Sequence, residues 1–196
     1  MLKTLWPARI IFGLILSVEV LGVAGILPIE PEFTWFGMIL QVLVAFAGFE
    51  LLGWFVRSKK IGYPIGAAAF LFALLVVADA SGDMAGLYGQ FAWYDAVLHF
   101  MGGFATAIVT AGFMIAVHDL KKPSKTRLVE VFLGSSGIAV MAQVLYEMEE
   151  YYEDLLTGSQ RLGDGFDTVS DLSLALYGAL IASAIILWLQ KRRVSR

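Results

Sequence analysis

The sequence predicts an all-α integral membrane protein, built as one bundle of six transmembrane helices with short loops. The chain of 196 residues is 59% hydrophobic and only 16% charged, whereas a soluble domain carries about 25% charge. Its mean hydropathy is +0.76, and its apolar residues form continuous blocks of about twenty, the length that spans ~30 Å of hydrocarbon. Such blocks exclude a transmembrane barrel, whose strands alternate over ~10 residues.

The first three blocks are expected to be helices, because lipid offers the backbone no hydrogen-bond partners. The first covers about 8–27; it contains Glu19 and no small-residue cleavage site before a soluble domain, so we interpret it as a helix and not as a cleaved signal. The second covers about 34–56 and ends before a basic loop. The third covers about 63–80, and Asp79 and Asp83 lie at its end.

The last three blocks predict helices over about 93–117, 127–151 and 168–190. The fourth helix begins with Asp95 and His99, and the fifth ends in a run of acids. Asp164 and Asp167 precede the sixth, which ends before a basic tail. The short connections indicate that consecutive helices are antiparallel neighbours, and the whole chain, 1–196, is expected to form one domain.

The basic residues predict the orientation in the membrane. Of the 14 lysines and arginines, all except Arg161 fall on one side of the expected bundle. The positive-inside rule places that side, and with it both chain termini, in the cytoplasm. We therefore expect a multi-pass protein of the plasma (inner) membrane.

Acidic residues gather at four helix ends on the opposite, extracytoplasmic side. Two stretches are alike there: YDAVLH, from Tyr94 to His99, and FDTVSD, from Phe166 to Asp171, each place a second ligand-type side chain four residues after an acid. Helical spacing puts these pairs, and Glu147 with Glu150, on inward-facing stripes, whereas Glu149 and Glu153 fall off the stripe and are expected to be solvated. The residues expected to share one acidic cavity are Asp79, Asp83, Asp95, His99, Glu147, Glu150, Asp164, Asp167 and Asp171.

So many carboxylates require an opposite charge or bound protons. Two unit charges 4 Å apart repel by roughly 4 kcal/mol at an effective dielectric of 20, and only Arg161 and His99 are available as bases on that side. A divalent cation, shared protons, or both are implied. The chain has no cysteine, and oxygen ligands with one imidazole suit Mg, Mn, Ca or Zn.

These considerations assign roles to the acidic residues. Glu150 or Asp164 is the expected catalytic base. The expected metal ligands are Asp79, Asp83, Asp95, His99, Glu147, Asp167 and Asp171.

The segments YDAVLHFMGGF and YEMEEYYEDLLTGSQRLGDGFDTVSDLSLALYGA resemble the YjdF-type family of bacterial inner-membrane proteins over roughly the second half of the chain. The resemblance implies a small multi-span fold and supplies no reaction. One departure is Phe166, where the family often has Trp. The tail from Gly163 to Asp171 is also similar to the CDP-alcohol phosphotransferases, but the upstream half of their motif is absent. The positions that carry the YjdF-type resemblance are Asp95, His99, Gly103, Glu147, Glu150, Asp164, Asp167 and Asp171.

Two functions stay open, with the first slightly favoured. One is a metal-dependent enzyme that acts on a lipid-like substrate, its metal polarising a phosphoryl or carbonyl oxygen or lowering the pKa of a bound water. The other is an ion- or proton-coupled carrier, whose acidic stripe Gln143 and Ser136 would extend inward. A cation sensor or assembly factor is a third reading, whereas a purely structural network is disfavoured because interhelical polar bonds contribute only about 0.6 kcal/mol on average. The expected partners are membrane lipids and a lipid-like or small-ion substrate, without nucleic acid, and a homo-oligomer is compatible with the sequence.

Overall fold

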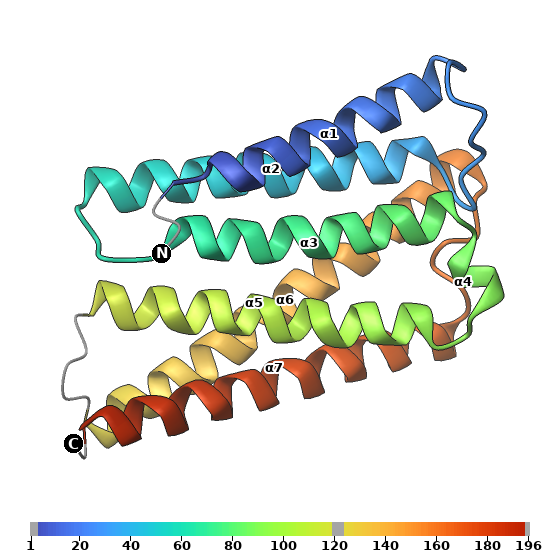
Figure 1. Cartoon of the computed structure of the whole chain (residues 1–196). Helices are drawn as coiled ribbons and strands as arrows, with labels where there is room; N and C mark the ends of the chain where they lie inside the picture. The colour runs from blue at the N-terminus through green and yellow to red at the C-terminus, as the bar shows by residue number, and fades with distance from the viewer. Residues whose placement is uncertain (1–3, 119–123, 195–196) are drawn as a thin grey trace.

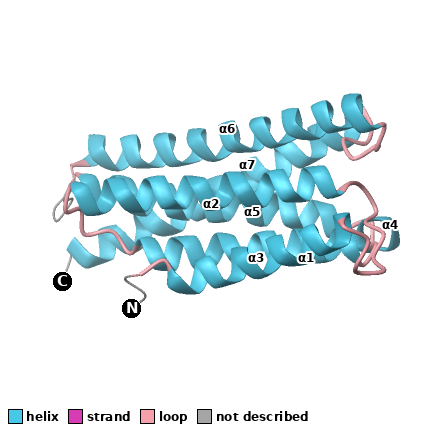
Figure 2. Ribbon diagram, turned by 90° about the horizontal axis from the view of Figure 1, so that it is seen from above, coloured by secondary structure: helices cyan, strands magenta, loops and turns pink. Residues whose placement is uncertain are grey.

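The computed structural model describes residues 4–118 and 124–194, and these ranges contain helices and loops but no strand (Figure 2). Six helices are long and apolar enough to cross a membrane, and they lie side by side in one bundle (Figure 1). The predicted all-α, six-helix membrane fold is therefore confirmed. The helices are α1 (Trp6–Val23), α2 (Trp35–Ser58), α3 (Ile65–Met84), α5 (Tyr94–Val117), α6 (Lys125–Thr157) and α7 (Gly165–Val194), with a one-turn helix α4 (Leu87–Gln90) between α3 and α5.

The helix ends follow from local chemistry and differ in places from the expected ones. α2 begins where the Thr34 side chain accepts a hydrogen bond from the Gly37 N–H, as N-cap residues do. α6 runs past residue 151, through the acidic segment, and ends at Thr157. Gly158 caps it, with a φ of 76°, the left-handed conformation that glycine adopts readily. The helix therefore carries all of its acids on continuous helical backbone.

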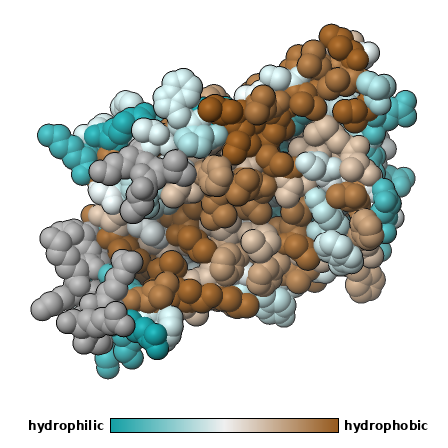
Figure 3. All heavy atoms as spheres, viewed as in Figure 1, coloured by the Kyte–Doolittle hydropathy of each residue, from teal (hydrophilic) through white to brown (hydrophobic). Residues whose placement is uncertain are grey.

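The surface of the bundle matches a protein surrounded by lipid. Apolar side chains cover its middle, and polar side chains lie at the two ends (Figure 3). Leu14, Val44, Leu51, Leu133 and Leu145 are each more than half exposed, which hydrocarbon tolerates and water does not.

The bundle has two halves of three helices. The helices α1, α2 and α3 share one apolar core, and α5, α6 and α7 share another, rich in alanine. The α5–α7 pair has the most extensive interface, since Gly103 lies directly on the Ala175 backbone and Gly178 on the Phe100 carbonyl, with no room for a Cβ. The halves meet chiefly where α3 packs on α5 and α2 on α6.

The four helix ends that the sequence grouped by their acids lie at one end of the bundle (Figure 1). This acidic end comprises the α1–α2 connection, α4 with its flanking turns, and the α6–α7 connection, and α1 begins and α7 ends at the opposite end (Figure 1). The convergence of four acid-bearing helix ends, which the sequence predicted, is thus present in the fold.

Candidate functional site

The acids at this end form two clusters, where the sequence predicted one shared cavity. The first centres on the imidazole of His99, and the second on the guanidinium of Arg161. Tyr146 lies between them, because its ring meets the His99 ring edge-on at 5.7 Å and its hydroxyl contacts Arg161. We call them the His99 cluster (Asp95, His99, Gln143, Glu147 and Asp171) and the Arg161 cluster (Asp79, Tyr146, Glu150, Glu153 and Arg161).

The His99 cluster joins α5, α6 and α7 around one buried imidazole. His99 Nε2 lies 3.1 Å from Asp95 Oδ1, one helical turn earlier, and 3.9 Å from Asp171 Oδ2 on α7. On the other side of the ring, Nδ1 lies 2.5 Å from Gln143 Nε2 and 3.6 Å from Glu147 Oε1. Ligand atoms of Asp95, His99 and Asp171 all lie within 4.8 Å of one another.

This cluster is rich in carboxylates and largely buried. The exposed fractions are 5% for His99, 5% for Glu147 and 4% for Asp171. Asp95 is partly open to solvent. No lysine or arginine pairs with the cluster within the described residues, and Glu147 Oε2 has no hydrogen-bond partner there. Three carboxylates therefore outnumber the one imidazole, and keeping all three ionised without a cation or bound protons is costly at this depth.

Asp164 and Asp167 lie at the margin of the site. Asp164 Oδ1 accepts hydrogen bonds from the N–H groups of Phe166 at 2.8 Å and Asp167 at 3.1 Å, and so caps the start of α7. The Asp167 side chain is exposed and folds back against Gly163. Within the part of the chain that the structure describes, neither carboxylate forms a hydrogen bond or an ion pair with His99.

The Arg161 cluster is a compact network of ion pairs. Arg161 Nε lies 3.1 Å from Glu150 Oε1, and its terminal nitrogens lie 3.7 Å from Asp79 Oδ2 and 3.6 Å from Glu153 Oε2. Arg161 also donates to the Tyr146 hydroxyl at 2.6 Å. Arg161, the one lysine or arginine that the sequence placed on this side, is therefore a buried counter-ion for several acids.

The loop after α6 explains how this arginine enters the bundle. Asp154 accepts hydrogen bonds from the Ser159 hydroxyl at 2.5 Å and from three backbone N–H groups, those of Gln160 (3.0 Å), Arg161 (2.8 Å) and Leu162 (3.1 Å). These bonds fold the chain back over the helix end after Gly158. Asp154 thereby directs the Arg161 side chain inward.

The environment keeps two groups of this network protonated. Burial lowers the pKa of Arg161, but the surrounding Tyr146, Asp79, Glu150 and Glu153 oxygens outweigh it and raise that pKa well above its usual value. Burial, reinforced by Asp79, raises the pKa of Tyr88, whose hydroxyl donates a hydrogen bond to Asp79. Both groups therefore act as fixed hydrogen-bond donors.

Asp79 and Asp83 lie apart from His99, although the sequence grouped them as metal ligands. Asp79 accepts from Tyr88 and, at 3.4 Å, from the Tyr146 hydroxyl. Asp83 is 1% exposed, and its Oδ1 accepts from the Phe33 N–H at 2.9 Å. Glu150, the expected base, is held by Arg161.

The expectation of a solvated Glu153 was wrong. Its side chain is 0% exposed and receives a hydrogen bond from the Thr34 hydroxyl at the start of α2, where Gly37 leaves room for the carboxylate. The positive end of the α2 dipole lies there and favours an anion. Glu149 is also half-buried, with both carboxylate oxygens inaccessible to solvent.

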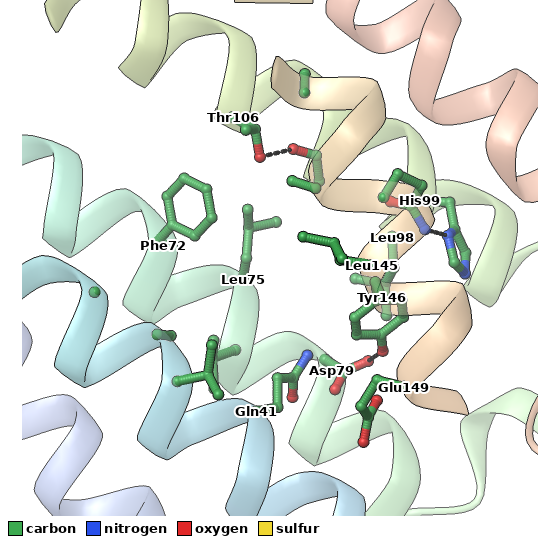
Figure 4. Close-up of a pocket in the computed structure, with 18 of the residues that line it drawn as sticks. Gln41, Phe72, Leu75, Asp79, Leu98, His99, Thr106, Leu145, Tyr146 and Glu149 are labelled. Carbon is green, nitrogen blue, oxygen red and sulfur yellow. Dashed lines mark hydrogen bonds between the residues drawn. The ribbon is translucent and has the colours of Figure 1, made fainter. Parts of the chain in front are cut away.

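A cleft of about 530 Å³ extends from the His99 cluster toward the middle of the bundle. It lies between α2, α3, α5 and α6, and most of its lining is apolar. Figure 4 shows Gln41, Asp79 and Glu149 gathered at one end of it, with Phe72 and Leu75 further along. The polar residues that line the cleft are Gln41, Asp79, Asp95, His99, Thr106, Gln143, Tyr146 and Glu149.

Comparisons with known proteins place the chain in a family without assigning an activity. No curated protein and no solved structure gives a significant match. A family profile described as "Predicted membrane protein (DUF2238)" matches residues 9–193, from α1 to α7. The chain therefore belongs to this family of predicted membrane proteins, DUF2238.

Proposed function

We propose that the His99 cluster binds a divalent metal ion and that the protein is a metal-dependent enzyme acting on a lipid-like substrate. The observation that carries the proposal is the approach of Asp95, His99 and Asp171, whose ligand atoms lie within 4.8 Å of one another. A divalent cation would offset the three carboxylates, which have only His99, and no lysine or arginine, as a basic partner in the described structure.

The chemistry of the donors fits such an ion. Two carboxylates and one imidazole suit Mg, Mn or Zn, and three protein ligands leave positions for water or substrate. With the metal on Nε2, the Nδ1–H of His99 would face Glu147 Oε1, 3.6 Å away, and the Gln143 amide, whose oxygen could accept it once the amide is turned so that Oε1 takes the place of Nε2. Metal-bound histidines commonly donate their second N–H in this way.

A metal held by Asp95, His99 and Asp171 would polarise a phosphoryl or carbonyl oxygen of the substrate or lower the pKa of a bound water. Glu147 is better placed than Glu150 or Asp164 to take a proton, because its Oε2 accepts no hydrogen bond within the described residues. Glu150 is held by Arg161, and Asp164 caps α7. Asp167 remains a candidate ligand from the rim.

A second candidate is an ion- or proton-coupled carrier. A second set of buried polar side chains, between α6 and α7, supports this function. The Ser183 hydroxyl lies 2.7 Å from that of Ser135 and 3.0 Å from that of Ser136. These hydroxyls continue the polarity that begins at Glu147 and Gln143 toward the opposite end of the bundle.

We also propose that the acidic end faces the extracytoplasmic side of the plasma membrane, with both termini in the cytoplasm. The support is the distribution of the 14 basic residues, all on the opposite side except Arg161. We also propose that the chain is related to the YjdF-type family. The support is that residues which carry the resemblance, among them Asp95, Glu150 and Asp171, lie together at the acidic end (Figure 1).

Metal analysis of the purified protein tests the proposal. About one divalent ion per chain is expected to remain after washing with a weak chelator. Adding the metal back to protein from which it has been stripped should raise the melting temperature. Asp95→Asn and Asp171→Asn should lose both effects. Glu30→Gln, an exposed acid in the α1–α2 loop, should keep them.

Equal metal content in the wild type and both Asn variants would refute the site. Liposome reconstitution separates the two functions. Ion flux that depends on Glu147, without lipid turnover, would favour the carrier over the enzyme.

A further inference from the structure

The cleft beside the His99 cluster has the dimensions of a hydrocarbon chain site. On α2 the residues Leu40, Val44, Gly48 and Leu52 line it at steps of four, so they share one helical face. This face is about 18 Å long, at 1.5 Å per residue, which exceeds half of a ~30 Å hydrocarbon core. The volume of about 530 Å³ lies within the range of ligand sites.

The cleft is also accessible from the surrounding lipid. Its walls on α2 and α6 include Val44, which is 63% exposed, and Leu145, which is 59% exposed. The contact between these two helices is among the least extensive in the bundle. A chain from a neighbouring lipid can therefore enter sideways between α2 and α6.

The end of the cleft near the acidic end contains acceptors that receive no hydrogen bond. Gln41 Oε1 and both carboxylate oxygens of Glu149 are inaccessible to solvent and accept no hydrogen bond in the described part of the chain. Asp79 Oδ2 is likewise inaccessible to solvent and accepts no hydrogen bond there, although Arg161 lies 3.7 Å away as its ion-pair partner. Buried acceptors without donors are rare in native structures, and a ligand in the cleft that carries N–H or O–H donors would satisfy those that line it.

We propose that the cleft binds an amine-headed phospholipid, with one hydrocarbon chain along the α2 stripe and the ammonium group donating to Glu149 and Gln41. The inference rests on the proposed function, because it names the substrate class for the same site. A carboxylate at this depth favours a cation over a neutral head group, and an ammonium carries N–H donors that a choline head lacks. The phosphate of such a lipid lies toward the His99 cluster, where a metal ion would offset its charge.

Native mass spectrometry of delipidated protein tests the head group. Phosphatidylethanolamine and phosphatidylcholine with the same chains differ in N–H donors, and phosphatidylglycerol offers hydroxyl donors on an anionic head. We expect phosphatidylethanolamine to be retained about tenfold more strongly than either, the effect of one hydrogen bond to a charged group. Glu149→Gln should remove the preference, and Glu130→Gln, at the other end of α6, should keep it.

A second variant tests the chain site. Gly48→Leu places a side chain in the cleft where a Cβ meets no atom within 4 Å, so the protein should fold and lose retention of all three lipids. Gly137→Leu, equally free of neighbours and outside the cleft lining, should bind as the wild type does. A lipid with a photoactivatable group in its chain should label the α2 stripe.

The outcomes distinguish this inference from the metal site. Equal retention of the ethanolamine and choline lipids, preference for the glycerol lipid, wild-type binding by Gly48→Leu, or labelling away from the α2 stripe would each overturn it. Metal content should be unchanged in both cleft variants. If the protein selects the ethanolamine lipid but holds no metal, the metal site is refuted and the lipid site is supported.

Discussion

Replacement of Arg161 by glutamine should destabilise the protein more than any change at a surface ion pair. The guanidinium lies within 3.1–3.7 Å of Glu150, Glu153 and Asp79 and donates to Tyr146 at 2.6 Å. Its side chain is 4% exposed, so water cannot replace it. Removing one partner of a buried ion pair costs about 3–5 kcal/mol, because the remaining charge stays buried.

Thermal unfolding in detergent measures this loss. For a chain of this size each kcal/mol shifts the midpoint by about 2–4 °C, so Arg161→Gln should melt roughly 6–20 °C below the wild type. Arg127→Gln is the matched control, since Arg127 pairs with Glu130 at 2.7 Å and both are about half exposed, at 49% and 47%. Such a pair contributes about 1 kcal/mol or less.

A shift for Arg161→Gln no larger than that of the control would refute the reasoning, because it would show that the acids do not need the guanidinium. A raised pKa means that the stabilisation is present below the unfolded pKa and is lost only as the pH rises through the folded pKa, which lies above the usual value of Arg. Arg161 itself is therefore charged at both about pH 7 and about pH 9.

Three further predictions concern the loop, the helix packing and the topology. Asp154→Ala removes the acceptor of four hydrogen bonds in the α6–α7 loop and should raise proteolysis of the loop while lowering the melting temperature; an intact loop would contradict the role given to Asp154. Gly178→Leu meets the Phe100 carbonyl and should cost about 1–3 kcal/mol in thermal unfolding, whereas Gly137→Leu should cost little. In a chain without native cysteine, Glu30→Cys should react with an impermeant maleimide on intact cells and Lys59→Cys only after permeabilisation; the reverse pattern would invert the proposed orientation.

The fold was predictable because lipid leaves the backbone few alternatives. Six apolar blocks must become six helices, and short loops fix their alternation, so the meeting of Asp95, His99 and Asp171 at one end follows from helix order and spacing. That part of the site depends on periodicity alone. It requires no knowledge of how the loops fold.

The division into two clusters was not predictable from the same pattern. It depends on the conformation after α6, where Asp154 turns Arg161 inward, and on the start of α2, where Thr34 meets Glu153. Glu153 falls outside the stripe of Glu147 and Glu150, but a second neighbour, α2, gives α6 a second buried face. Helical periodicity identifies one face and cannot count the neighbours of a helix.

The close packing of α5 against α7 also bears on which ion could be accepted between them. Asp95, His99 and Asp171 project from two helices whose backbones touch at Gly103 and Gly178, so their separation cannot adjust freely to a cation. Magnesium requires oxygen atoms at about 2.0–2.1 Å, whereas calcium accepts about 2.3–2.6 Å and a looser shell. Such a rigid arrangement would select cations by their radius. Gly103 and Gly178, which would not contact the ion, would set the spacing of its ligands.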